Sequence, residues 1–280
     1  MGVVAEIERE LARQRCRARE DDGLPELRTS TLTHVVWAPP RWLPQVRSTL
    51  AGLHERHPAR TIVLIPEPGR RDAVAASVAV REFTLRGIDR EVVSEVIEVR
   101  LRGRPAEHPA SIVLPLLLSD LPVFCRWRGE PAWGRAGLVE IVGVVDRLVV
   151  DSSEWRSPAR GFEQLERLFR RVAVSDLAYR RTLPWRQRLA GLWPGIKIAR
   201  SLHVTGPRAD ALLLAGWLRS RLRREVTLRV SAAEAVTGVS VDGDPVEPPA
   251  VNGATASTLL SAELDVLSRD RVYEAAVRAV

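Results

Sequence analysis

The chain has 280 residues, 45% of them hydrophobic, and a net charge of +7, so it can bury a sizeable core in one large domain or two modest ones. Its two cysteines, Cys16 and Cys125, exclude a disulfide framework and a cysteine-based zinc site. No apolar run is long enough to span a bilayer, and the charged N-terminal segment has no signal-peptide core. We therefore expect a cytoplasmic protein.

The basic charge invites a nucleic-acid interpretation, but its distribution argues against one. Lys197 is the only lysine, and every other basic residue is arginine, which packs and pairs with carboxylates better than lysine does. The acidic residues are interspersed among the basic ones, with no basic tail or stripe. Nucleic-acid binding is therefore kept only as a minor alternative.

Alternating and continuous apolar patterns predict mixed helices and strands in the first part of the chain. In chain order, we expect a helix over 4–19, a strand over 28–37, a helix over 42–57, a buried parallel strand over 61–65, and an antiparallel pair over 78–86 and 91–102.

The stretch 101–127 is the most apolar part of the chain and should lie at the centre of a layered α/β domain. A strand ends near Arg102, a helix is predicted over 106–118 with an interruption at Pro115, and a second strand is predicted over 123–127.

The remaining elements predict a second α/β region after a helical one. In chain order, we expect a loop over 129–137, a strand over 147–150, helices from 157 to 193, a strand over 196–204, a helix over 207–222, a strand over 226–230, a hairpin turn at Asp242-Gly243, a strand over 264–267 and a helix over 270–280.

The fold class predicted is α/β, with layered mixed sheets, flanking helices, and two α/β halves joined by a helical segment. The predicted division is an N-terminal α/β domain over 1–152, a helical connector over 153–194, and a C-terminal α/β domain over 195–280.

A search for catalytic chemistry finds no glycine-rich nucleotide loop, no metal-binding histidine motif and no catalytic triad. His54 and His57 are three residues apart, but no further metal ligand is indicated, and capping of a helix C-terminus explains them better. We therefore predict no catalytic residue, no cofactor and no metal.

One strand-to-helix junction could hold a phosphate or carboxylate. Arg102, Arg104, His108 and Ser111 surround the expected helix N-terminus there. A purely structural role is the favoured alternative, because Glu107 in the first turn would complement the helix dipole from within the protein.

The cysteines and tryptophans carry weaker signals. Cys125 lies in an expected buried strand and should be inert, whereas Cys16 stands among arginines and could be a redox-sensitive thiol. Most of the eight tryptophans fall near arginines and element ends. Trp and Arg dominate interface hot spots, although at least half of these rings should simply close a core.

Five distinctive stretches follow one another along the chain: HPAR at 57–60, AEHPASIV at 106–113 leading into LLL at 116–118, DRLVVDS at 146–152, DLAYRRTLPWR at 176–186 and LLLAGWL at 212–218. Together they resemble the OpcA family of glucose-6-phosphate dehydrogenase assembly proteins.

The resemblance implies a non-enzymatic partner of glucose-6-phosphate dehydrogenase that promotes the active oligomer or acts as an allosteric activator. Such a factor would support NADPH supply through the oxidative pentose phosphate pathway. Some members of the family are redox-controlled through cysteines, but neither Cys16 nor Cys125 matches such a site.

The Arg- and Trp-rich segment that follows the predicted core helix suggests a partner-docking surface. Its proposed members are Trp155, Tyr179, Arg180, Arg181, Trp185, Arg186 and Trp217. On this hypothesis, joint replacement of Trp185 and Arg186 by alanine weakens partner binding while the protein stays folded.

The alternative function is an α/β domain that binds a phosphorylated small molecule at 102–111. A thermal-shift screen with sugar phosphates and NADP separates it from the assembly factor, because a ligand stabilises the native state by mass action. Strong salt-dependent affinity for RNA or DNA would favour the third alternative.

Overall fold

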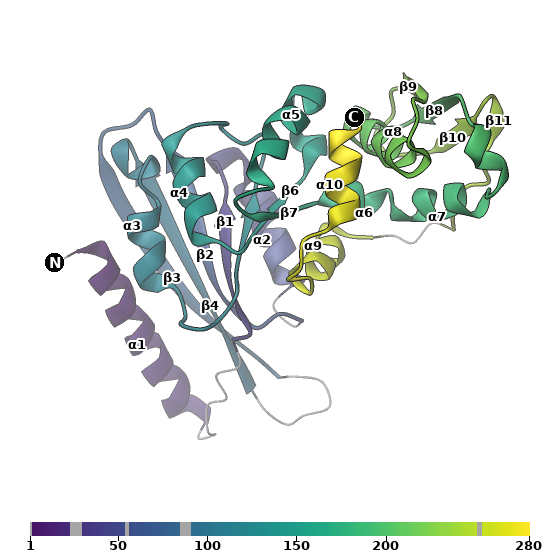
Figure 1. The fold of residues 1–280 in the computed structure, drawn as a ribbon. Helices are drawn as coiled ribbons and strands as arrows, with labels where there is room; N and C mark the ends of the chain where they lie inside the picture. Colours follow the sequence, from purple (N-terminus) through teal and green to yellow (C-terminus); the bar gives the residue numbers. More distant parts are fainter. Residues whose placement is uncertain (1, 23–29, 54–55, 85–90, 251–253) are drawn as a thin grey trace. The chain divides into compact units, whose positions relative to one another are not determined.

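The computed structural model describes residues 2–22, 30–53, 56–84, 91–250 and 254–280. The chain forms two compact units, Met1–Leu148 and Val149–Val280, and each is described separately below. Figure 1 shows helices and strands mixed throughout, so the predicted α/β class with mixed sheets and flanking helices is confirmed. The three-part division at about 152 and 194 stays a prediction.

The first unit is built around a mixed sheet. Its elements in chain order are α1 (Val3–Asp22), β1 (Leu32–Trp37), η1 (Pro40–Trp42), α2 (Leu43–Ala51), β2 (Ala59–Glu67), β3 (Ala73–Thr84), β4 (Glu91–Arg102), η2 (Arg104–Ala106), α3 (Ala110–Val113), η3 (Leu114–Leu116), β5 (Val123–Trp127) and α4 (Ala136–Val144), and β6 (Arg147–Val150) runs across the unit boundary.

The sheet has seven strands in the order β3-β4-β2-β1-β5-β6-β7, of which β7 is formed by Ala173–Asp176. Strand β1 is parallel to β2 and β5, β2 is parallel to β4, and β3 returns antiparallel to β4. The apolar run of β2 is buried along almost its whole length, as expected for a central parallel strand. The predicted antiparallel pair is confirmed as β3 and β4.

Helix α1 protects the open edge of this sheet. The Gln14 side chain donates a hydrogen bond to the Val78 carbonyl at 3.0 Å and accepts one from the Val80 N–H at 3.1 Å. The amide thus replaces a missing neighbouring strand on β3, and Figure 1 shows α1 running beside that strand. Covering an edge in this way prevents unwanted strand pairing.

The second unit carries a smaller sheet and most of the longer helices. Its elements in chain order are η4 (Ser152–Glu154), α5 (Pro158–Leu168), β7 (Ala173–Asp176), α6 (Leu177–Arg181), α7 (Leu183–Gly191), η5 (Gly195–Ile198), β8 (Ser201–Thr205), α8 (Arg208–Leu222), β9 (Thr227–Ser231), β10 (Gly238–Val241), β11 (Asp244–Pro245), α9 (Ala256–Leu264) and α10 (Arg271–Arg278). The four-stranded sheet has the order β11-β10-β8-β9, and the hairpin predicted at Asp242-Gly243 joins β10 to β11.

Several predicted elements are wrong. The helix expected over 106–118 is interrupted at Pro115 as predicted, but Pro105 and Pro109 interrupt its hydrogen bonding as well, so that it is broken into η2, α3 and η3. Residues 264–267, expected as a strand, instead form the last residue of α9 and the turn after it, and the Thr255 hydroxyl caps the first turn of that helix. The strand expected from 196 starts only at Ser201, after η5. Helix α4 and the buried strand β7 were not expected.

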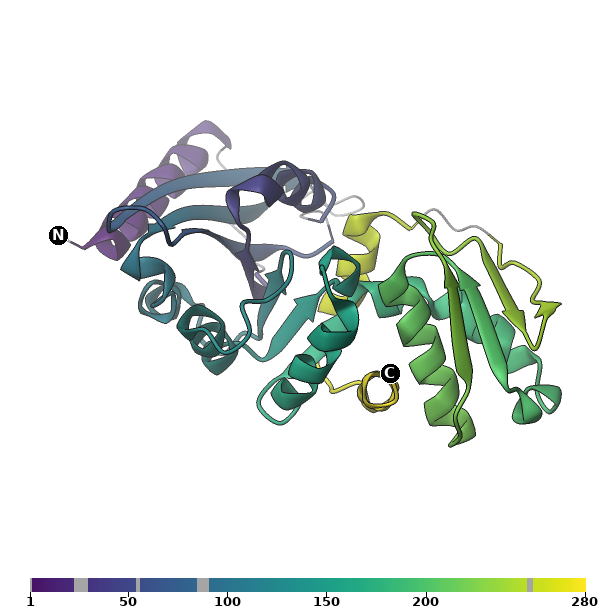
Figure 2. The ribbon, with the colours of Figure 1, turned by 90° about the horizontal axis from the view of Figure 1, so that it is seen from above.

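Helices α8 and α10 approach closely at a glycine. A Cβ at Gly216 would lie 2.2 Å from the carbonyl oxygen of Ala276, so no larger residue fits without moving α10. Figure 2 shows the two helices in contact within the second unit, with α10 viewed along its axis.

We expect Gly216→Ala to lower the free energy of unfolding by about 1–3 kcal/mol, the usual effect of overpacking a close contact. Urea unfolding followed by tryptophan fluorescence measures this. Gly191→Ala is the matched control, because nothing lies within 4 Å of a Cβ at Gly191. Equal stability of the two variants would contradict the close approach of α8 and α10.

Candidate functional site

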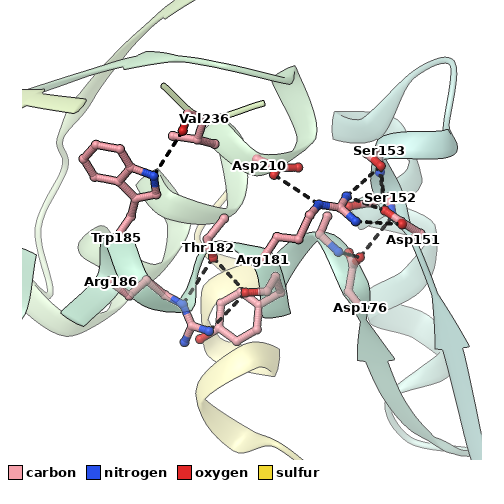
Figure 3. Close-up of polar contacts among 12 residues, drawn as sticks. Asp151, Ser152, Ser153, Asp176, Arg181, Thr182, Trp185, Arg186, Asp210 and Val236 are labelled. Atoms are coloured by element: carbon pink, nitrogen blue, oxygen red, sulfur yellow. Dashed lines mark hydrogen bonds and ion pairs between the residues drawn. The ribbon is translucent and has the colours of Figure 1, made fainter. Parts of the chain in front are cut away.

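The strongest polar arrangement is a cluster in the second unit, here called the Asp–Arg cluster, formed by Asp151, Asp176, Arg181 and Asp210. Asp151 follows β6, Asp176 ends β7, Arg181 ends α6, and Asp210 lies in the first turn of α8. Figure 3 shows the Arg181 guanidinium between Asp151 and Asp210. All three carboxylates are at least nine-tenths buried.

Asp151 holds Arg181 through two charge-assisted hydrogen bonds. The two terminal nitrogens of Arg181 donate to the carboxylate oxygens at 2.9 and 2.8 Å, and one also donates to the Ser153 hydroxyl at 2.8 Å. Such bidentate pairs are the strong ones in proteins. Burial alone would lower the pKa of Arg181, but the hydrogen bonds and charge of Asp151 outweigh it and raise that pKa.

Asp176 serves mainly as a backbone cap. One of its oxygens accepts the N–H groups of Ser152 at 3.0 Å and Ala178 at 2.9 Å, which ties the start of η4 to the start of α6. The other oxygen lies 3.4 Å from the Tyr273 hydroxyl. Burial and the nearby Asp151 charge raise the pKa of Asp176 to about 6.

Asp210 is the least compensated member of the cluster. Its nearest cation is Arg181 at 3.7 Å, and its Oδ1 atom is buried with no hydrogen-bond partner among the described residues. Burial raises its pKa to about 7, although Arg181 acts in the opposite direction. Arg181 therefore faces both the Asp151 and the Asp210 carboxylates, and the cluster orients β6, β7, α6 and α8 rather than presenting a nucleophile.

The predicted docking residues are only partly at the surface. Trp155, Tyr179 and Trp185 are buried, and the indole N–H of Trp185 donates to the Val236 carbonyl at 3.3 Å within the core of the second unit. Burial raises the pKa of Tyr179 to about 12. These rings are therefore not available to a partner in this structure, and the predicted double variant of Trp185 and Arg186 would test the core as well as docking.

The other predicted docking residues are partly exposed. The Arg186 guanidinium lies over the Tyr179 ring, 3.6 Å from its centre, and donates to the Tyr179 carbonyl at 3.1 Å. Arg180 pairs with Glu263 at 3.6 Å, and Trp217 is half-buried against the core. Partner contact by Arg180, Arg186 and Trp217 stays a prediction, while Arg181 is committed to the Asp–Arg cluster.

The arginines of the predicted anion site, Arg102 and Arg104, have partners within the first unit. Arg102 pairs with Glu67 at 3.1 Å, and Arg104 pairs with Asp72 at 3.6 Å. Desolvation would raise the pKa of Glu67, but its hydrogen bonds from Arg102 and Arg100 outweigh this and lower that pKa.

His108 and Ser111 are also engaged within the chain. His108 Nδ1 lies 2.8 Å from Glu140 Oε1, and the Ser111 hydroxyl donates to the His108 carbonyl at 2.8 Å. Helix α3 has only four residues, so the expected helix N-terminus is short. The anion site stays a prediction, and these contacts support the structural role.

The remaining predicted residues fall as follows. Cys125 is buried, and burial raises the pKa of its thiol to about 12, whereas Cys16 is exposed on α1. Helix α2 ends at Ala51, so His57 does not cap it, and His54 lies outside the described residues.

Where the structure describes the chain, no group of His, Cys, Asp and Glu is arranged to hold a metal ion. None of its described helices is long and apolar enough to cross a bilayer.

Sequence reasoning missed the Asp–Arg cluster. Asp151 follows β6 and Asp176 ends β7, so each lies at the carboxyl end of a short strand, which is a usable signal, and Asp210 lies between two alanines in the first turn of α8. These observations define an α/β protein whose main polar cluster pairs internally and stabilises the fold.

Two protein-family models match this chain, one after the other. Residues 51–167 match the glucose-6-phosphate dehydrogenase subunit N-terminal domain, and residues 172–248 match the corresponding C-terminal domain. The chain belongs to this OpcA glucose-6-phosphate dehydrogenase assembly family.

Two similar relatives are both called "Putative OxPP cycle protein OpcA". The one from Nostoc punctiforme is 27% identical over 178 residues, which are 60% of this chain and 38% of the relative. The one from Synechocystis is 25% identical over 142 residues, 47% of this chain and 30% of the relative. The matched region is therefore less than half of either relative.

Proposed function

We propose that this protein binds glucose-6-phosphate dehydrogenase and promotes its assembly or its active state. The observation that carries the proposal is the ordered match of both family domains, which together extend from residue 51 to residue 248. The names of the relatives place those proteins in the oxidative pentose phosphate cycle, which the dehydrogenase opens. This protein would then support NADPH production without itself transferring hydride.

The finer part of the proposal is allosteric activation. A factor that binds the active oligomer better than the inactive form shifts the population toward it, by as much as its differential affinity allows. Typical coupling free energies correspond to roughly 5- to 150-fold changes in affinity. The same linkage requires that substrate strengthens binding of this protein to the dehydrogenase.

We expect this protein to raise the activity of the dehydrogenase from the same organism at low glucose 6-phosphate by roughly fivefold or more, in line with typical coupling. The activity is measured against increasing concentrations of this protein, with elution of both proteins on a sizing column. The gain should saturate, and the two proteins should elute together. No gain and separate elution would overturn the proposal.

A further inference from the structure

Three large apolar side chains are exposed on one short segment of the second unit, between α7 and β8. Leu192 is 42% exposed, Trp193 59% and Ile198 74%. Exposed apolar groups that gather on one segment are unusual on a protein surface and mark interaction sites. We call Leu192, Trp193, Lys197 and Ile198, together with Arg224, the 192–198 surface.

The core of the second unit holds this surface in place. Leu189 and Ala199 are buried on either side of the exposed residues, Ile196 is buried between them, and all three belong to the core cluster around Trp185. The Ile196 N–H donates to the Leu192 carbonyl at 3.1 Å, and the Lys197 N–H donates to the Pro194 carbonyl at 3.1 Å. A surface fixed in this way loses little conformational freedom on binding.

Cations border the apolar side chains. The Lys197 ammonium lies 4.6 Å from the centre of the Trp193 ring, and Arg224 donates to the Lys197 carbonyl at 3.2 Å. In the part of the chain that the structure describes, no carboxylate lies within ion-pair distance of Lys197 or Arg224. Arg188, one helical turn before Leu192, pairs with the well-exposed Glu247 at 3.3 Å and donates to the Pro248 carbonyl at 3.5 Å.

The sequence around this surface is strongly basic. From residue 177 to residue 224 the only carboxylate is Asp210, which is buried beside Arg181. The same stretch carries eleven basic residues: Arg180, Arg181, Arg186, Arg188, Lys197, Arg200, Arg208, Arg219, Arg221, Arg223 and Arg224. Arg180, Arg181, Arg188 and Arg219 pair with carboxylates. Lys197 and Arg224 are not paired in this way in the described part of the chain, so their positive charge is complementary to an acidic surface.

We propose that the 192–198 surface docks a partner protein through an apolar patch that is bordered by Asp and Glu carboxylates. The inference rests on the proposed function, so the partner surface belongs to glucose-6-phosphate dehydrogenase. A tryptophan flanked by cations is the composition that interface hot spots favour. Trp193 fills the apolar patch, while Lys197 and Arg224 meet the carboxylates and steer the encounter.

The test measures the affinity of the full chain for the dehydrogenase. Trp193→Ala is expected to weaken binding by roughly 30-fold or more, the change that corresponds to a hot spot of about 2 kcal/mol. Reversing both charges, with Lys197→Glu and Arg224→Glu in one variant, should slow association with the dehydrogenase, most strongly at low salt. Ile198→Ala is a second apolar variant, should Trp193→Ala fail to fold.

Two controls match these variants. Leu267→Ala removes an apolar side chain that is 63% exposed elsewhere in the same unit. A variant with both Arg167→Glu and Arg170→Glu makes the same charge change on exposed residues at and just after the end of α5. Neither control should alter the affinity, and thermal melting should show that all variants are folded.

Each outcome decides between the claims. If the wild type binds the dehydrogenase and the surface variants bind equally well, the inference is wrong and the proposed function stands. If the wild type does not bind, both fail. The variants could instead bind the dehydrogenase normally but no longer bind vesicles of equal parts phosphatidylcholine and phosphatidylserine, or no longer form a dimer that the wild type forms. In either case the surface has another occupant and the inference is overturned.

Discussion

Replacement of Arg181 by alanine is expected to lower the free energy of unfolding of the second unit by about 3–5 kcal/mol, the usual loss when one partner of a buried ion pair is removed. The reason is geometric. The Asp151 carboxylate is about nine-tenths buried and receives two hydrogen bonds from the Arg181 guanidinium, at 2.9 and 2.8 Å. Alanine leaves that charge inside the protein without its main cation.

The loss extends beyond one pair, because the same guanidinium lies 3.7 Å from Asp210. Without Arg181, the carboxylates of Asp151, Asp176 and Asp210 repel one another in a poorly hydrated site. The destabilisation should therefore shrink at acidic pH, where the carboxylates become protonated and no longer need a cation. A loss that depends on pH in this way distinguishes lost charge compensation from lost side-chain packing.

Urea unfolding at neutral and acidic pH, followed by circular dichroism, measures this effect. Arg188→Ala is the matched control, because it breaks a pair with Glu247, whose side chain is 78% exposed. Exposed pairs contribute only about 0–1 kcal/mol. Equal losses for Arg181→Ala and Arg188→Ala would show that the Asp–Arg cluster does not stabilise the second unit.

The sequence pattern predicts elements well where the signal is local. The continuous apolar run of β2 reflects burial on both faces of the strand, and the alternation in β3 and β4 reflects burial on one face. The strands predicted from these two patterns were confirmed. The interruption predicted at Pro115 is confirmed, and Pro109 also breaks the helix that was expected over 106–118. Short buried elements such as β7 have too few residues to show a period.

The candidate sites depend on tertiary contacts that no local pattern encodes. Trp185 and Trp193 lie on one short segment with similar neighbours, yet the first is buried in the core and the second is exposed. Asp151, Arg181 and Asp210 come from different elements, and only the fold brings them together. Residue types therefore indicated an interface rich in Trp and Arg but could not assign its members.

Replacement of Asp210 by asparagine should change how stability depends on pH. Burial raises the pKa of Asp210 to about 7, above its ordinary value of 3.8. The folded state therefore holds this proton over a range in which the unfolded chain has already lost it. The contribution of Asp210 to the free energy of unfolding is fully present below about pH 4 and is lost as the pH rises to about 7. A paired carboxylate usually does the reverse, because its contribution is lost as the pH falls.

Asparagine keeps the size of the side chain and an oxygen that can face Arg181, but it cannot ionise. The variant should match the wild type near pH 4 and become the more stable protein by pH 8. The gap between the two pKa values sets an upper limit of roughly 4 kcal/mol for the difference, at about 1.36 kcal/mol for each pH unit. Coupling to Asp176, whose pKa burial also raises to about 6, spreads the transition over a wider pH range.

The measurement is the difference in unfolding free energy between Asp210→Asn and the wild type from pH 4 to pH 8, in which contributions common to both proteins cancel. Asp242→Asn supplies a control of opposite sign. Hydrogen bonds from the Arg200 and Ser201 N–H groups lower the pKa of Asp242, so its stabilisation is present at neutral pH and is lost on acidification. A flat difference for Asp210→Asn would mean that Arg181 compensates Asp210 fully.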